Sequence, residues 1–212
     1  MKTALAPVLT MKSKAVRRAS RPMVALEPSE LLSVMKIARA NSTRDWAMIL
    51  VAYCHGLRAS EVCGLTLTDI SLKTGSIKIA RLKGSLETTQ ALSAHKGNPL
   101  LDEFVALRSW LKERTADGSE ALFASQKGGS LDRSQFYRIF RGYAQKSGLP
   151  ATKQHPHCLK HSLATHLISA DTNLAKVQQA LGHRSIGSTM QYVRVTDAQA
   201  DDARRSALMN IF

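Results

Sequence analysis

The segment HPHCLKHSLATHLISADTNLAKVQQALGHRSIGSTMQY, residues 155–192, decides the fold of this chain. It opens with the pattern H-x-x-K-H, passes through an apolar run with helical spacing, and reaches L-G-H-x-S before a lone tyrosine, Tyr192. Gly182 follows the last apolar residue of a helical pattern and is a typical helix terminator, which places His183 just beyond a helix end. The segment therefore predicts short helices that carry basic and proton-transferring side chains toward one phenol.

A second motif, G-L-R-A-S-E at residues 56–61, lies upstream of this segment. The residues before it, 44–55, are apolar on nearly all sides and predict a buried helix that ends at Gly56. A basic residue that follows such a helix is held by the core, and the planar fork of Arg58 suits two oxygens of one phosphate. The alternative is a surface salt bridge between Arg58 and Glu61. The order of the two motifs favours the phosphate.

Taken together, the two motifs resemble the active site of tyrosine recombinases, the phage-integrase family. Members of that family typically combine G-L-R-x-S-E with H-x-x-R-H, L-G-H and a tyrosine. The resemblance covers about residues 27–195 and departs at one position, because Lys160 stands where the family usually has arginine. It implies a fold that is mainly α with a small antiparallel β-sheet on one side (α+β).

The resemblance also implies how these residues act on DNA. Attack on a phosphodiester builds negative charge on its equatorial oxygens, so positive donors must point at them. A phenol with a pKa near ~10 needs a base or cationic surroundings, and His157 is the expected base. Tyr192 then becomes linked to a 3′-phosphate. The catalytic set that the resemblance implies is Arg58, Lys83, His157, Lys160, His183 and Tyr192.

Lys83 enters this set through a predicted β-hairpin over residues 75–93, whose first strand alternates apolar and polar residues. In the resembled family, a lysine on this hairpin reaches the minor groove and protonates the leaving oxygen. Lys83 matches best because it directly precedes the turn glycine, with Lys78 and Lys96 as alternatives. A solvated turn lysine is the non-catalytic interpretation.

Other side chains near the motifs are interpreted as supports. Glu61 is expected to orient a positive group without touching DNA. His161 is expected to support the site from a second layer, and His166 to pack, because one helix cannot aim every histidine at the same phosphate. Core positions are predicted for the remaining tyrosines: Tyr53, Tyr137 and Tyr143.

The composition favours a nucleic-acid partner. The chain has 212 residues and a net charge of +14, which attracts polyanions. Its apolar runs are too short for a transmembrane helix. The 3 cysteines lack paired spacing, which indicates reduced thiols and hence the bacterial cytoplasm or nucleoid. Neither a metal nor another cofactor is expected, because carboxylate clusters and zinc-ligand spacings are missing from the sequence.

Three sections of the chain are predicted. Residues 1–26 form a basic, flexible arm that either contacts DNA or serves as a solubilising tail. Residues 27–196 form the catalytic domain without a preceding core-binding domain, so the chain is either a short recombinase, as fimbrial phase-variation invertases are, or a truncated one. Residues 197–212 form a weakly amphipathic helix that packs on its own domain or, as in the resembled family, on a neighbouring protomer.

The sequence therefore predicts a recombinase that performs integration, excision or inversion. Its expected partners are double-stranded DNA with a specific recombination site and further copies of the chain, assembled as a tetramer on paired sites; no membrane is expected. One alternative is a DNA-binding protein on a catalytically degenerate scaffold, which Lys160 would mark. Another is a type IB topoisomerase-like enzyme, which relaxes supercoils with the same chemistry.

Overall fold

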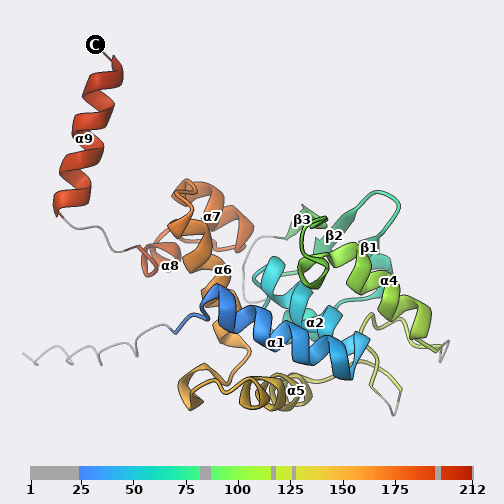
Figure 1. Cartoon of the computed structure of the whole chain (residues 1–212). Coiled ribbons are helices and arrows are strands. Elements are labelled where there is room, and N and C mark those ends of the chain that lie inside the picture. The colour runs from blue at the N-terminus through green and yellow to red at the C-terminus, as the bar shows by residue number, and fades with distance from the viewer. Residues whose placement is uncertain (1–23, 82–86, 116–117, 126–127, 194–196, 212) are drawn as a thin grey trace, which may run out of the picture.

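The computed structural model describes residues 24–81, 87–115, 118–125, 128–193 and 197–211. Within these residues the chain is mainly helical with one small antiparallel sheet, which confirms the predicted fold class (Figure 1). The α-helices are α1 (Pro28–Asn41), α2 (Thr43–Cys54), α3 (Ala59–Cys63), α4 (Glu103–Glu113), α5 (Arg133–Lys146), α6 (His157–Ser169), α7 (Leu174–Ala180), α8 (Gly187–Met190) and α9 (Asp197–Ile211). The other elements are β1 (Ile70–Ser71), β2 (Ser76–Ile79), β3 (Thr88–Ala91) and the 3-10 turns η1 (Leu67–Asp69), η2 (Pro99–Leu101) and η3 (Ala151–Lys153).

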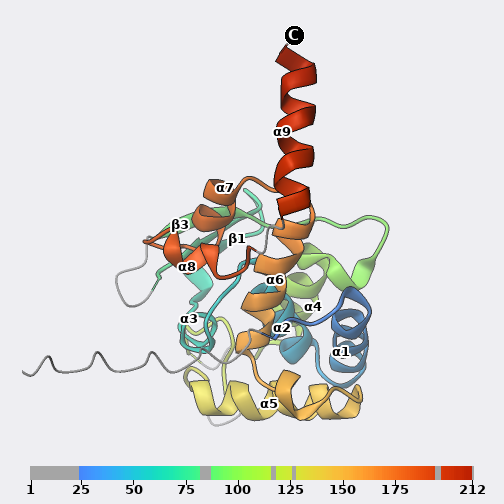
Figure 2. The ribbon, with the colours of Figure 1, turned by 90° about the vertical axis from the view of Figure 1, so that its left-hand side faces the viewer.

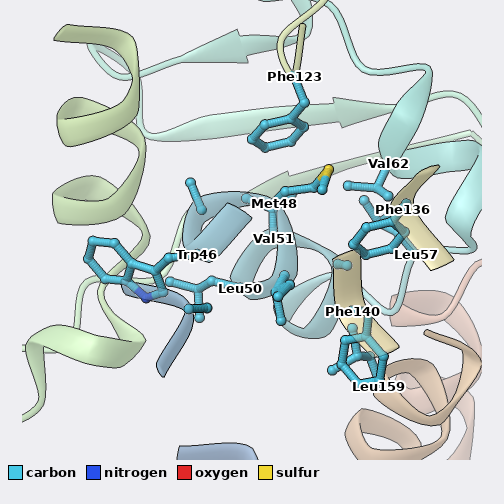
Figure 3. Close-up of a cluster of buried hydrophobic side chains, with 14 of the residues drawn as sticks. Trp46, Met48, Leu50, Val51, Leu57, Val62, Phe123, Phe136, Phe140 and Leu159 are labelled. Carbon is cyan, nitrogen blue, oxygen red and sulfur yellow. The ribbon is translucent and has the colours of Figure 1, made fainter. Parts of the chain in front are cut away.

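Helix α2 forms the centre of the fold because it is apolar on nearly every side. Residues 46–52 are at most 1% exposed, and α1, α4 and α6 pack around them. Phe136 and Phe140 of α5 belong to the same buried cluster (Figure 3). Helix α5 itself lies across one end of the molecule (Figure 2). Since α2 ends within this core, the turn that follows Cys54 is fixed in place.

The sheet has the order β1-β2-β3, with both pairs antiparallel. Ile77 of β2 pairs with Gln90 of β3, and Ile79 pairs with Thr88, which confirms the predicted hairpin. The two isoleucines face the core. Residues 82–86 lie outside the described residues, and with them the predicted catalytic residue Lys83.

Two stretches of the sequence form helices that are shorter than the stretches themselves. The amphipathic stretch over residues 99–114 is divided into η2 and α4, because the side chain of Asp102 caps α4 by accepting a hydrogen bond from the Val105 amide at 2.9 Å. Within residues 185–192 only α8 is helical, so Tyr192 follows that helix and does not lie within it.

A second, smaller core joins α6 to α7. Its buried members are Ala164, Val177 and Leu181. Four partly buried residues pack against them, among them Tyr192. The segment that carries Tyr192 thus rests on far less buried apolar surface than the turn after α2.

The two ends of the described chain differ. Leu26 is buried, and its amide donates to Ser162 Oγ at 2.7 Å, so the folded part begins slightly before the predicted boundary. The predicted arm lies almost wholly outside the described residues. At the other end, α9 projects away from the domain, with Met209 82% and Ile211 70% exposed (Figures 1 and 2). Every helix in the described residues is too short or too polar to span a bilayer.

Candidate active site

Arg58 directly precedes helix α3 as its N-cap residue and is held there by Glu61. Gly56 turns the chain in the left-handed region at φ 55°, and the buried Leu57 anchors the turn. The Arg58 amide then donates to Glu61 Oε2 at 2.8 Å, and its guanidinium Nη1 donates to Oε1 at 2.6 Å. Burial acts to raise the pKa of Glu61, but the hydrogen bonds from Arg58 and the charge of Arg81 outweigh it and lower that pKa. Arg58 therefore meets a stable carboxylate and keeps 31% of its side chain exposed.

Arg58 and His157 line the same pocket, which has a volume of about 450 Å³. Its other wall is helix α5, where Tyr137 is 42% exposed. The prediction that Tyr137 lies in the core is wrong: α5 turns Phe136 and Phe140 inward, and its periodicity points the intervening residue outward. The pocket is also lined by Ala59, Arg133, Ser134, Arg138, His155 and Pro156.

The phenol of Tyr192 contacts His161. Its Oη lies 2.8 Å from His161 Nδ1. His157, the predicted base, instead stacks edge-on against His161 with ring centroids 4.3 Å apart, because residues four apart share a helix face. His161, expected only in a second layer, is thus the histidine nearest the phenol oxygen among the described contacts.

The titration of this pair follows from its surroundings. Burial raises the pKa of Tyr192 to about 12, with the charge of Arg58 opposing the shift. Burial, reinforced by His157 and other neighbours that carry positive charge when protonated, lowers the pKa of His161 to about 4. The pKa of His157 is also lowered, by desolvation first and then by the charge of Lys160. At neutral pH the phenol and His161 are therefore both uncharged.

His183 completes this side of the site. Gly182 ends the preceding turn at φ 63°, as the motif predicts, and His183 is buried just beyond it. Its Nδ1 lies 3.0 Å from Thr189 Oγ1 of α8, and its ring stacks at 6.4 Å from that of Tyr192. Burial and the charge of Lys160 lower its pKa to about 4.

Lys160 is placed differently from the prediction that it faces the phosphate. Its side chain is 2% exposed, and Nζ donates to the carbonyls of Gly56 at 2.8 Å and Leu181 at 2.9 Å. Burial, together with the charge of Arg81, lowers its pKa to about 7. Lysine is shorter than the arginine usual in the family, and its compact head ends between two backbone carbonyls. In this position Lys160 links the turn at Gly56 to the end of helix α7 at Leu181.

Arg81 contacts the site although it lies outside both sequence motifs. It is buried, and its guanidinium donates to the carbonyls of His55 and Ala180, each at 2.9 Å. The sequence does contain a signal for it: Arg81 continues the alternation of Ile77 and Ile79 two residues beyond the end of β2, so its side chain is expected on the same buried face. An arginine on a buried face needs a partner.

The remaining predicted residues have structural partners. His166 Nδ1 lies 2.9 Å from Tyr53 Oη, and its Nε2 lies 2.9 Å from the Leu26 carbonyl, which fits the predicted packing role. Lys78, an alternative to Lys83, pairs with Glu87 at 3.3 Å on the exposed face of the hairpin.

Residues 25–199 match the phage integrase family. The type 1 fimbriae regulatory protein FimB of Escherichia coli K12 is 38% identical over 173 residues, which are 79% of this chain and 82% of FimB. FimE of the same strain is 37% identical over 157 residues, 72% of this chain and 75% of FimE.

Solved structures show the same fold. The crystal structure of XerA recombinase has a TM-score of 0.70 and 26% identity, and the match covers 90% of this chain and 65% of that one. XerH bound to its difH substrate has a TM-score of 0.71 and 25% identity, covering 91% of this chain and 57% of XerH. The chain thus spans less than two thirds of these two structures. From the family match and the two fimbrial relatives, we conclude that this chain belongs to the phage integrase family and is a tyrosine-type site-specific recombinase.

Proposed function

We propose that the chain cuts and rejoins duplex DNA at a specific site through a covalent bond between Tyr192 and a 3′-phosphate. The observation that carries the proposal is the position of the phenol, which lies 2.8 Å from His161 Nδ1 with the ring of His183 stacked nearby. A nucleophile within hydrogen-bond distance of a base is the arrangement that covalent catalysis requires.

The proposed step is a transfer of the phosphoryl group. Tyr192 Oη attacks the scissile phosphorus, and the bond from phosphorus to the 5′-oxygen breaks. The phenol proton passes to a histidine, and the leaving 5′-oxygen takes up a proton, for which Lys83 is the candidate. The reverse step rejoins a strand, and the bond energy is kept in the phosphotyrosyl link.

Two histidines compete for the role of base. Sequence reasoning favours His157, whereas the distance to the phenol favours His161. With a pKa of about 4, His161 is a weak base in the protein alone. A bound phosphate would raise that pKa, because a nearby negative charge favours the imidazolium form. We therefore propose His161 as the first acceptor of the phenol proton, with His157 stacked against it.

The pocket beside Arg58 supports DNA as the substrate. Arg58, Arg133 and Arg138 line it, and the two arginines of α5 are exposed. Three guanidinium groups on one pocket favour phosphate oxygens. The related XerH was crystallised with its difH substrate. We propose double-stranded DNA and further copies of this chain as partners, in the bacterial cytoplasm.

Replacement of the nucleophile tests the proposal. Tyr192→Phe removes only the hydroxyl, so covalent adducts with a nicked suicide duplex should disappear from denaturing gels while DNA affinity stays nearly unchanged. Tyr53→Phe is the matched control, because it removes a hydroxyl that hydrogen-bonds a histidine away from the site. Adducts that persist in Tyr192→Phe would assign the attack to another residue.

The wild-type protein separates the alternatives. A degenerate DNA-binding protein would bind duplex DNA and form no adduct. A topoisomerase-like enzyme would relax a supercoiled plasmid that lacks any recombination site. A recombinase should give joined products from two site-bearing duplexes and leave the site-free plasmid supercoiled.

A further inference from the structure

Arg81 lies two residues beyond the end of strand β2, directly before residues 82–86, and its guanidinium is buried. Nη2 donates to the carbonyls of His55 and Ala180 at 2.9 Å, and Nη1 donates to the Gly56 carbonyl at 3.2 Å. Nη1 also lies 3.4 Å from Glu61 Oε2. The Arg81 side chain is 0% exposed.

The three carbonyls belong to the two segments that deliver the predicted site residues. His55 and Gly56 directly precede Leu57 and Arg58, whereas Ala180 precedes the turn to His183. Arg81 therefore ties the turn that carries Arg58 to the turn that carries His183. It also touches Glu61, which fixes the Arg58 guanidinium.

The backbone is adapted to this guanidinium. A Cβ on Gly182 would lie 2.8 Å from Arg81 Nε, so any larger residue would displace the arginine or the turn. Lys160 joins the same two turns from helix α6 by donating to Gly56 and Leu181. Burying two basic groups side by side costs free energy, and the backbone carbonyls that accept hydrogen bonds from Arg81 and Lys160 offset that cost.

We propose that Arg81 is a positioning residue for DNA cleavage, which holds Arg58 and His183 in register with each other. It does not touch DNA in this arrangement. The fork geometry of a guanidinium lets one side chain serve several acceptors, which neither lysine nor glutamine reproduces. This inference rests on the proposed function, because it assigns Arg81 a role in that reaction.

The test compares Arg81→Met and Arg81→Lys with wild type in single-turnover cleavage of a nicked suicide duplex at saturating protein. Both variants should cleave roughly tenfold to a hundredfold more slowly, since small misplacements of reacting groups have effects of that size. The dissociation constant for the duplex should stay within about threefold, because Arg81 is buried. Rates are divided by the fraction of protein that finally forms adduct, so partial unfolding does not mimic the effect.

Arg44→Met is the matched control. Its guanidinium also bonds a carboxylate, Asp45, and a backbone carbonyl, that of Ala124, but it lies at the start of α2, outside the pocket that Arg58 lines. This variant should lose stability and keep the wild-type cleavage rate per active molecule. Equal slowing in Arg44→Met and Arg81→Met would overturn the proposal.

A neutral substrate distinguishes positioning from general loosening. A methyl group in place of one non-bridging oxygen of the scissile phosphate removes most of the charge that Arg58 must stabilise. If Arg81 acts by aiming Arg58, the rate deficit of Arg81→Met should shrink on this duplex, as should that of Arg58→Met. A deficit of unchanged size would overturn the proposal. If wild type itself forms no adduct with the ordinary duplex, the proposed function fails instead.

Discussion

The two halves of the site rest on very different foundations. Arg58 follows helix α2, whose residues 46–52 are buried in the main core. Tyr192 follows the short helix α8 and packs against a core whose buried members are Ala164, Val177 and Leu181. The half that carries Arg58 is therefore built into the main core, whereas Tyr192, the proposed nucleophile, rests on far less buried apolar surface.

This contrast separates two tasks. An arginine that stabilises charge works best when it is fixed before the substrate arrives. A tyrosine that must attack, stay bonded and later be released benefits from a segment that opens at low cost, and functional segments commonly come from the less stable parts of a protein. Lys160 and Arg81 are two buried side chains that join these halves.

The largest loss of cleavage rate is expected from replacing Lys160, which joins the two halves. Lys160→Ala leaves the carbonyls of Gly56 and Leu181 without their donor, and it removes a positive charge near the site. Cleavage of a suicide duplex under single-turnover conditions should fall about a hundredfold, equivalent to roughly 3 kcal/mol. Lys160→Arg keeps donors for both carbonyls and should stay active.

Lys153→Ala provides the comparison for Lys160→Ala. Lys153 donates to Glu30 at 2.6 Å, so its loss also breaks a partly buried lysine contact, but in a different part of the domain. Its cleavage rate should be close to wild type. Cleavage by Lys160→Ala at the wild-type rate would show that Lys160 takes no part in the reaction.

A pair of core substitutions compares the two foundations directly. Leu50 and Leu181 are both fully buried. Leu50→Ala should lower the free energy of unfolding by about 3 kcal/mol or more, and Leu181→Ala by about 2 kcal/mol, because the smaller core can relax around the gap. Hydrogen exchange should accelerate throughout the domain in Leu50→Ala, but chiefly over residues 174–193 in Leu181→Ala. Uniform acceleration in both variants would mean that the two cores unfold as one unit.

Acid should weaken the tyrosine half first. The pKa values of His161 and His183 are lowered from 6.5 to about 4 in the folded protein. Between these values the unfolded chain binds more protons, so the free energy of unfolding should fall as the pH drops from about 6.5 to about 4. Denaturant titrations at several pH values measure the slope, which should be shallower in His183→Gln. If the free energy of unfolding of His183→Gln varied with pH as steeply as that of wild type, the lowered pKa of His183 would be contradicted.

The smallest effect on single-site cleavage is expected from removing residues 198–212. Helix α9 projects from the domain with Met209 and Ile211 exposed, so it contributes little to the fold as described. We propose that this helix packs on a neighbouring protomer. The truncated protein should bind and cleave one site normally and form fewer multimers on paired sites, measured by native gel shift. Normal assembly and recombination by the truncated protein would refute the trans contact.

Local patterns predicted much of the fold. The uniformly apolar run before Gly56 gave the buried helix α2, and alternation around Ile77 and Ile79 gave the hairpin. The order of the two motifs also predicted that Arg58, His157, His183 and Tyr192 lie in one region. These inferences succeeded because helical and strand periodicity are properties of neighbouring residues.

Other features depended on contacts between distant parts of the chain. Arg81 meets Ala180 across 99 positions, and no local pattern specifies that partner. The contact between His161 and Tyr192 needed the fold of α7 and α8 before the phenol could return to α6. The sequence did not predict the burial of Lys160, because a lysine in a catalytic motif is expected to be exposed. In the structure its Nζ donates to two buried backbone carbonyls, those of Gly56 and Leu181.

Those two carbonyls have a consequence for proton balance. A neutral amine still carries two N–H groups, so Lys160 can lose a proton without losing either bond to Gly56 or Leu181. With a pKa of about 7, it is partly neutral when no DNA is bound. An arriving phosphate favours the ammonium form, so binding should draw protons from the solvent. Lys160 would then gain its proton, and with it a positive charge, when DNA binds. The measured heat of binding would therefore depend on the ionisation enthalpy of the buffer that supplies the proton.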